Sequence, residues 1–160
     1  MALYMKYASI DGSATTDGYV KWIELSSFQF GVGRAIASAA RSAENREASE
    51  PSISEITVTK NMDTSSLGMF EEGLASEMNN KVTIKFTTTT KNKVTDFLIY
   101  ELTNVGLSGY SISAGTEGIP TESLSLNFTK IMMTFIGLNP AVAGQAKSAT
   151  YDLTQMKLNP

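Results

Sequence analysis

The sequence predicts a mainly β fold, in which about eight strands form a closed or nearly closed barrel flanked by one amphipathic α-helix. Two observations support this prediction. Stretches of alternating apolar and polar residues recur along most of the chain, and a single segment instead repeats its apolar residues every three or four positions. A closed barrel also removes the exposed edges that eight strands would otherwise leave. With 160 residues and no internal repeat, the chain is predicted to be a single domain over residues 1–160.

The alternating stretches predict the strands one by one. Their approximate ranges are 3–10, 19–30, 53–60, 81–90, 94–105, 107–113, 121–136 and 149–157. The clearest is "KVTIKFTTTT", in which Val82, Ile84 and Phe86 face one side and lysine and threonine face the other. The "KNK" that follows it is predicted to be a hairpin turn into the next strand.

The helix is predicted over residues 63–78, within "MDTSSLGMFEEGLASEMNN". The apolar residues that follow helical spacing are Leu67, Phe70, Leu74 and Met78. Asp63 or Thr64 is a candidate N-cap, and Asn79–Asn80 is a candidate end. Two internal glycines each weaken a helix by about 1 kcal/mol relative to alanine, so we expect docking on the barrel to supply most of its stability.

Residues 34–52, "RAIASAARSAENREASEPS", separate two predicted strands. Their alanine, serine and charge content is compatible with a solvated loop, a short helix over "AIASAARSAENREA", or a projecting arm that becomes ordered on a partner. A structureless loop of this length is uncommon within a compact domain, which favours a functional role.

The stretch "SLSLNFTKIMMTF", residues 123–135, changes the side of the strand that carries its apolar residues. The first group is Leu124, Leu126 and Phe128, and the group on the opposite parity is Ile131, Met133 and Phe135. Bulges at barrel corners would explain such a change, and so would outer apolar strips covered by another chain. Because a monomer with a large exposed apolar strip would aggregate, the sequence predicts an oligomer with side-by-side contacts.

The composition excludes several kinds of chemistry. The chain has no cysteine and no histidine, so it forms neither a disulfide nor the usual thiolate or imidazole metal sites. The same absence excludes Ser-His-Asp and Cys-His catalysis. A hydrolase that uses carboxylates alone is left as a minor alternative, with Glu101 and Glu122 as its candidates. We therefore expect no enzyme activity, no metal and no cofactor.

The charge distribution predicts no nucleic-acid partner and no membrane insertion. Thirteen basic against sixteen acidic residues give a net charge of −3, and no two basic residues are adjacent. Nowhere do eighteen apolar residues follow one another, and the start "MALYMKYASIDG" has no long apolar segment. We expect a protein that folds in the cytoplasm and, if exported, leaves by a route that needs no cleaved signal peptide.

Three stretches occur in a defined order along the chain: "DGYVKWIELSSFQFGVG", "PSISEITVTKNMDTSSLGMFEEGL" and "FLIYELTNVGLSGYSISAGTEGIPTESLSLNFTKI". In order and spacing they resemble the Hcp family, the tube protein of bacterial type VI secretion systems, over about residues 3–136, with a weaker similarity in "TYDL" near the end. The resemblance implies a curled two-sheet β-barrel with one flanking helix, assembled into six-membered rings that stack into a hollow tube. A contractile sheath expels the tube, and the lumen can carry effectors. The implied partners are therefore copies of the chain, effector proteins, and the spike and sheath components.

The resemblance also implies roles for individual residues. Gln29 occupies the position where family members often carry a small polar residue facing the lumen. Residues 34–52 match the family's extended loop, which reaches toward the adjacent ring. The charged residues of that loop are Arg34, Arg41, Glu44, Arg46, Glu47 and Glu50. The predicted subunit contact consists of Ile131, Met133 and Phe135, the outer apolar strip.

The sequence departs from the family pattern at three places. Gln29 is larger than the usual serine, "EGI" precedes "PTE" where many members have an Asp-Arg pair, and Met132 and Met133 stand where aromatic residues are common. These departures concern cargo choice and the strength of ring stacking more than the fold. The alternative function is a monomeric β-barrel that binds a small apolar ligand.

Overall fold

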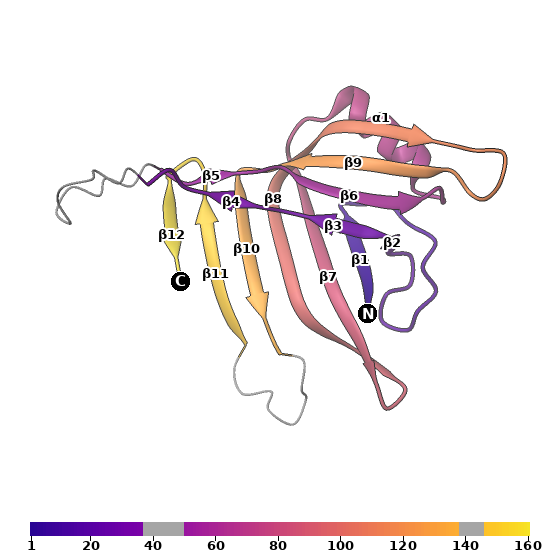
Figure 1. Cartoon of the computed structure of the whole chain (residues 1–160), viewed down its shortest axis with the longest axis horizontal. Coiled ribbons are helices and arrows are strands. Elements are labelled where there is room, and N and C mark those ends of the chain that lie inside the picture. Colours follow the sequence, from indigo (N-terminus) through magenta and orange to yellow (C-terminus); the bar gives the residue numbers. More distant parts are fainter. Residues whose placement is uncertain (37–49, 138–145) are drawn as a thin grey trace.

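The structure is a computed structural model of the chain and describes residues 1–36, 50–137 and 146–160 (Figure 1). Within these ranges the chain folds mainly into antiparallel strands, with one helix, α1 (Ser66–Ala75). The predicted mainly β class with a single helix is thereby confirmed. The helix is shorter than the predicted span of 63–78.

The larger sheet has the strand order β12-β11-β10-β8-β7-β1-β2, and all its pairs are antiparallel. The bounds are β1 (Ala2–Tyr7), β2 (Ile23–Leu25), β7 (Asn80–Thr90), β8 (Lys93–Ser113), β10 (Lys130–Phe135), β11 (Lys147–Asp152) and β12 (Lys157–Asn159). Because β2 and β12 lie at the two ends of this order, the pairing among the described residues does not close on itself. The closed barrel stays a prediction.

The smaller sheet crosses one part of the larger one. It consists of β3 (Ser27–Gln29), β6 (Ile56–Asn61), β9 (Thr121–Asn127) and the second half of β8. The short strands β4 (Val32–Gly33) and β5 (Ser52–Ile53) form a separate pair, which we call the arm. Figure 1 shows the smaller sheet lying across β8, β7 and β1, and the arm continuing past β10 toward β11 and β12.

Strand β8 belongs to both sheets because its two halves have different neighbours. Residues 93–105 pair with β7 and β10, and residues 106–113 pair with β9. Asn104, at the junction, has a φ of 53°. A Cβ added to Gly106 would lie 2.5 Å from the Cγ of Met78, so only glycine fits this close approach. The strands predicted at 94–105 and 107–113 are therefore one bent strand.

Two other predicted strands are divided between the sheets. The stretch 121–136 forms β9 in the smaller sheet and β10 in the larger one, with a break at Phe128 and Thr129. The stretch 19–30 is divided at Ser26 between β2 and β3. The apolar residues change parity because the chain passes from one layer to the other, and each layer turns its apolar face to the shared core. The prediction of single continuous strands was wrong at these two places for this reason.

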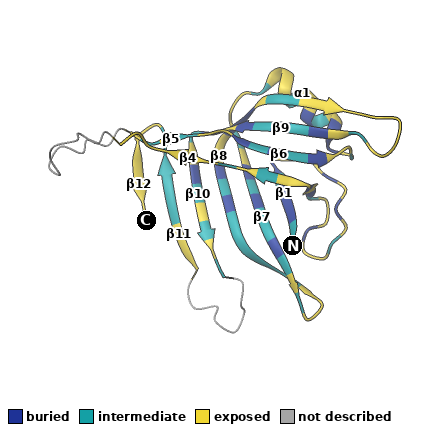
Figure 2. Ribbon diagram, viewed as in Figure 1, coloured by how far each residue is buried: buried dark blue, intermediate teal, exposed yellow. Residues whose placement is uncertain are grey.

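The main hydrophobic core lies between the two layers and under α1 (Figure 2). Its fully buried members are Met5, Tyr7, Ile23, Val82, Ile84, Leu102 and Val105 from the larger sheet, Ile56, Val58, Leu124 and Leu126 from the smaller sheet, and Met69 from α1. A second cluster of Tyr4, Ala14 and Tyr19 covers the other face of β1. Strand β1 is thus buried on both faces, whereas β12 at the far end of the larger sheet is exposed throughout.

Candidate functional site

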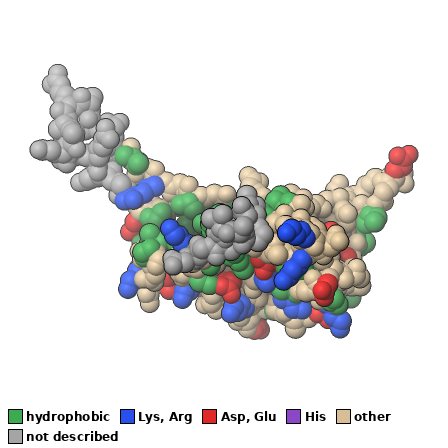
Figure 3. All heavy atoms as spheres, turned by 90° about the horizontal axis from the view of Figure 1, so that it is seen from below, with side chains coloured by type: hydrophobic (Ala, Val, Ile, Leu, Met, Phe, Trp, Pro, Cys, Tyr) green, Lys and Arg blue, Asp and Glu red, His purple; other side chains and the backbone are tan. Residues whose placement is uncertain are grey.

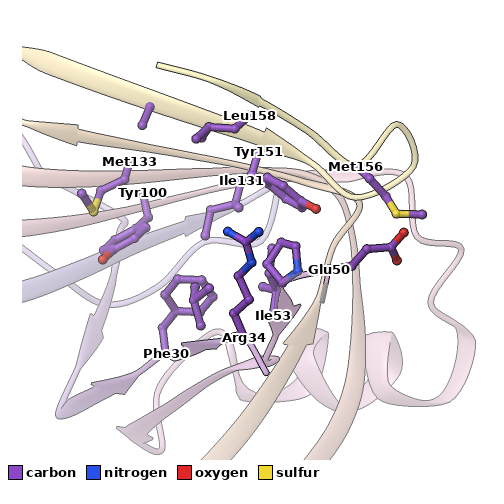
Figure 4. Close-up of a pocket in the computed structure, with 13 residues that line it drawn as sticks. Phe30, Arg34, Glu50, Ile53, Tyr100, Ile131, Met133, Tyr151, Met156 and Leu158 are labelled. Carbon is purple, nitrogen blue, oxygen red and sulfur yellow. The ribbon is translucent and has the colours of Figure 1, made fainter. Parts of the chain in front are cut away.

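The most distinctive surface is an apolar groove between the β10-β11-β12 end of the larger sheet and the arm. It encloses about 630 Å³. The sheet contributes Tyr100, Ile131, Met133, Ala149, Tyr151 and Leu158, together with Met156 from the β11-β12 turn, and the facing wall contributes Phe30, Val32, Pro51 and Ile53. Figure 4 shows these side chains converging from the two walls, with Arg34 reaching in from the arm side and Glu50 lying near Met156.

The groove is a continuation of the main core. Met133 of β10 lies directly opposite Tyr100 of β8 and Ala149 of β11. Since paired residues point to the same face of a sheet, Met133 shares the face of the larger sheet that elsewhere forms the core. The smaller sheet does not extend over this end, so the apolar face emerges into the groove.

The three predicted subunit-contact residues differ in burial. Ile131 is buried in the core of its own chain. Met133 and Phe135 are 41% and 50% exposed. The exposed apolar surface at this end also includes Leu158, at 60%, and Met156, which the sequence pattern did not single out. An exposed apolar surface shared by several strands is typical of a binding site.

A second apolar surface lies on α1. Of the four apolar residues predicted to form one face of the helix, Leu67, Phe70 and Leu74 are 68%, 49% and 74% exposed, and we call them the helix stripe. The fourth, Met78, lies beyond the end of α1 and is 40% exposed. The face turned to the protein instead carries Ser66, Met69 and the two glycines. A Cβ on Gly73 would lie 3.3 Å from that of Tyr110, which shows how closely the helix approaches β8. The helix does dock on the protein, but mainly through Ser66, Met69 and the glycines, whose small size allows a close approach. Leu67 and Leu74 lie outside this contact, and Phe70 at its edge packs against the ring of Tyr110.

On the side away from the core, the smaller sheet presents two rows of uncharged polar side chains, with the exposed Glu55 at their edge, near Gln29. Gln29 lies on this face opposite Thr57, and Thr57 lies opposite Ser125. The next row consists of Ser27, Thr59, Ser123 and Ser111. Gln29 is exposed, as a lumenal residue would be. Side chains in these two rows offer hydroxyl and amide groups and no charge.

A buried ionic cluster fastens the start of α1 to the smaller sheet. The Lys60 Nζ lies 2.7 Å from Glu122 Oε1 and 2.9 Å from Asp63 Oδ1. Glu122 also accepts hydrogen bonds from Ser66 Oγ and Tyr110 OH, both at 2.5 Å. Lys60 and Glu122 are fully buried, and every buried side-chain polar atom among the described residues has a hydrogen-bond partner.

The cluster determines the protonation of its members. Desolvation would raise the pKa of Glu122, but the hydrogen bonds from Lys60, Ser66 and Tyr110 outweigh it and hold that pKa below its usual value. The pKa of Asp63 is lowered in the same way, since hydrogen bonds from Ser65 and Lys60 outweigh its desolvation. Burial, with a smaller contribution from the hydrogen bond to Glu122, raises the pKa of Tyr110 to about 12. At neutral pH Glu122 and Asp63 are therefore carboxylates, and Tyr110 keeps the proton that it donates to Glu122.

The sequence contains a pattern that indicates this cluster, but alternation along single strands does not reveal it. Lys60 has the same parity as the buried Ile56 and Val58, and Glu122 has the same parity as the buried Leu124. Opposite charges on the inward parity of two strands predict a buried pair once those strands are known to be neighbours. Only the tertiary structure shows that these two strands, β6 and β9, are neighbours.

Only two of the six charged residues predicted to contact the adjacent ring belong to the described part of the chain. Arg34 and Glu50 lie at the mouth of the groove. Arg41, Glu44, Arg46 and Glu47 lie outside the described residues. The structure therefore locates where this loop leaves and re-enters the fold, next to the arm.

Metal sites and membrane-spanning helices are absent from the described ranges. In residues 1–36, 50–137 and 146–160, no group of three or more acidic side chains is placed to hold a metal ion. In the same part of the chain, no helix has the length and apolar character needed to cross a membrane.

Comparison with known proteins gives a family match over most of the chain. The family model described as "Type VI secretion system effector, Hcp" matches residues 4–135. No curated protein sequence matches. A solved structure described as a type six secretion system protein is similar at 23% identity and a TM-score of 0.89, with 99% of both chains covered.

Two further solved structures share the fold. Hcp1 from Salmonella typhimurium is similar at 17% identity and a TM-score of 0.77, covering 99% of this chain and 98% of its own. A type VI secretion system effector from Yersinia pestis is similar at 16% identity and a TM-score of 0.75, covering 94% and 98%. At these identities the likeness establishes a common fold.

Proposed function

The chain belongs to the Hcp family of type VI secretion proteins, and we propose that it is a structural subunit that assembles into hexameric rings stacked as the inner tube of the apparatus. Family membership makes it a tube or effector protein of that system. The ring, its stacking and its cargo are the proposal. Its partners are further copies of itself, effectors, and the spike and sheath components, and it has no catalytic role of its own.

The main observation in support of this proposal is that the smaller sheet does not cover the β10-β11-β12 end of the larger sheet. Met133, Phe135 and Leu158 belong to the core-forming face but are left 41% to 60% exposed. The helix stripe is exposed as well, on a different element. Two different apolar surfaces on one chain favour a heterologous contact, in which one patch meets another on the next copy, and such contacts close into rings.

The polar face of the smaller sheet supports a lumenal role for Gln29. This face has only polar neutral side chains in the two rows that include Gln29 and Ser27. A neutral hydroxyl surface holds proteins of either net charge without strong electrostatic attraction, which suits a conduit that must release its cargo. We therefore assign cargo contact to this face.

The stacking of rings is assigned to the loop over 34–52. Arg34, Arg41, Glu44, Arg46, Glu47 and Glu50 supply both signs of charge for a contact with the adjacent ring. After assembly the protein leaves the cytoplasm through the secretion apparatus itself, so this route needs no cleaved signal peptide.

The assembly is tested by native mass spectrometry and negative-stain electron microscopy of the purified chain. We expect six-membered rings with a central opening. A protein that stays monomeric at high concentration and low salt contradicts the proposal.

The lumenal face is tested by Gln29→Arg, with Ser148→Arg on the opposite face of the larger sheet as the matched control. We expect both variants to form rings and only Gln29→Arg to lose co-purifying cargo. Dissociated rings in the Gln29 variant would place that residue in a subunit contact instead.

The apolar groove favours one second candidate function, the binding of a small apolar ligand by a monomer. Its volume of about 630 Å³ is within the range of small-molecule sites. Saturable binding of a fluorescent apolar probe by a protein that remains monomeric would support this function over the tube subunit.

A further inference from the structure

Two apolar surfaces lie on separate parts of the molecule. Figure 1 shows α1 above the sheets, beside β9, and the β10-β11-β12 edge with the arm toward the left. Figure 3 shows hydrophobic side chains gathered at the end that carries the arm. We propose that the helix stripe of one copy, Leu67, Phe70 and Leu74, inserts into the apolar groove of the next copy. This inference rests on the proposed ring and specifies which surfaces join.

The groove is incomplete without an added layer. Its floor, including Met133 and Tyr151, is the same apolar sheet face that the smaller sheet covers elsewhere. A sheet face of this kind is stable when a second layer of helix or strand packs on it. Among the described residues, the arm supplies one wall of that layer, and a groove of about 630 Å³ lies between this wall and the sheet.

The helix has the length that this space requires. With ten residues, α1 is about 15 Å long. With six residues each, β10 and β11 span about 20 Å. A helix presenting side chains at positions i, i+3 and i+7 places them along one side, which matches insertion into a groove of this length.

The charges of the two surfaces are complementary. Residues 61–80 contain four carboxylates and no lysine or arginine, and Glu71 and Glu77 among them are exposed. On the groove side, the described residues carry Lys147 on β11, with Arg34 and Glu50 at the mouth of the groove, whereas Lys130, Asp152 and Lys157 lie opposite one another on the other face of the sheet. Lys147 lies opposite Phe135, on the groove face. An acidic helix is therefore attracted to this end of the neighbour.

The same charges disfavour a symmetric contact. Pairing of two helix stripes would bring the carboxylates of two acidic helices together, and pairing of two grooves would bring the Lys147 side chains of both copies to one interface. A helix-to-groove contact avoids both repulsions, and each copy then uses its helix stripe with one neighbour and its groove with the other. Because the two surfaces are different and lie on separate elements, a contact between them repeats from copy to copy, as a ring requires.

Disulfide trapping tests the contact directly, since the natural chain contains no cysteine. We pair Met133→Cys with a cysteine at Leu67, Phe70 or Leu74 in three double variants. At least one is expected to yield a ladder of disulfide-linked multimers after mild oxidation. Met132→Cys is the matched control, because its neighbouring position points to the opposite face of β10. Ladders that are equally strong with Met132→Cys, or absent with all three Met133 pairs, overturn the inference.

A charge substitution provides a second test. We expect Leu74→Asp to lower the association constant of the subunits by more than about tenfold. The circular dichroism spectrum of the chain should be unchanged. Ala75→Asp adds the same charge one residue further along the exposed helix, and its rings should persist. Rings that persist equally in Leu74→Asp contradict the helix-to-groove contact.

The outcomes separate this inference from the function on which it rests. A wild-type chain that forms rings, with neither cross-links nor sensitivity at Leu74, retains the proposed function and refutes the contact. A wild-type chain that never forms rings refutes both. Cross-linking by Leu74→Cys alone would indicate a helix-to-helix contact and also refutes the inference.

Discussion

The two ends of the larger sheet carry the same kind of apolar side chain but differ in what covers them. In one cross-strand row, Met5 and Ile84 are fully buried, Tyr100 is nearly so, and Met133 is 41% exposed. Exposure thus rises along a single row of paired residues, from the end under the smaller sheet to the end beyond it. Alternation along a strand determines which face is apolar, and only a second layer determines whether that face is buried.

The comparison also explains why the uncovered end is a candidate for assembly. Each apolar side chain transferred from water to a packed interface contributes about 1.5–3 kcal/mol. At the covered end this gain stabilises the fold of the single chain. At the other end no described part of the chain covers these side chains, so contact with another molecule would give the same gain to a complex.

The largest effect is expected from placing a charge at equivalent positions of the two ends. Ile84→Asp should unfold the chain, because an unpaired buried carboxylate costs several kcal/mol, a large share of the total stability of a domain. Met133→Asp should leave the monomer folded and prevent assembly. Circular dichroism combined with size-exclusion chromatography measures both. A Met133 variant that is unfolded would show that this end is part of the folding core after all.

The next largest effect is expected at the ionic cluster of the covered end. Glu122→Gln removes the carboxylate that faces Lys60 at 2.7 Å, and leaving that lysine without its principal counter-charge is expected to lower the free energy of unfolding by about 3–5 kcal/mol. Asp11→Asn at the exposed Lys6–Asp11 pair is the control, with an expected loss of about 0.2–1 kcal/mol. Urea denaturation followed by fluorescence compares them. Equal losses would contradict the role assigned to burial.

A smaller effect is expected at the junction of the two sheets. Gly106→Ala places a Cβ against Met78 and should lower the stability by about 1–3 kcal/mol, because the side chain of Met78 must move. Gly33→Ala is the control, since no atom lies within 4 Å of a Cβ at that position. Thermal denaturation of the two variants shows whether this junction is as closely packed as the distance indicates.

The smallest effect is expected in the acid dependence of stability. The pKa values of Glu122 and Asp63 are lowered in the folded chain, so both groups contribute stability that is present above their ordinary pKa. This contribution is lost as the pH falls through the lowered folded-state values. We expect Glu122→Gln to flatten the acid limb of a plot of unfolding free energy against pH. An unchanged slope would show that Glu122 is not ionised in the native state.

Individual residues show how far the sequence prediction extends. The alternation in "KVTIKFTTTT" correctly identifies Val82 and Ile84 as core, because β7 is a long strand with one buried face. The parity change between Leu126 and Ile131 was visible, but it was assigned to one strand when it marks the passage between two sheets. Which sheet each half joins depends on contacts with distant residues.

The helix gives the clearest difference between pattern and packing. Spacing alone predicts a helix over residues 63–78 with Leu67, Phe70, Leu74 and Met78 on one face, and the structure has a shorter helix, Ser66–Ala75, within that range. The spacing does not identify which face meets the protein. The close approach permitted by the glycines and by Ser66 turns the opposite face inward. An apolar face on a helix predicts that another surface packs against it, but the pattern does not tell whether that surface belongs to the same chain or to another.

The sequence by itself determined the mainly β class, the position of the helix, the family, and the absence of cysteine and histidine chemistry, because these follow from local periodicity, residue type and motif order. Only the tertiary structure decided which apolar residues are buried, how Lys60 meets Glu122, and where the two exposed apolar surfaces lie. Burial is a relation between elements far apart in the chain, and it depends on which layer covers which. A local pattern records the side of an element that is apolar, and the arrangement of the layers determines what that side meets.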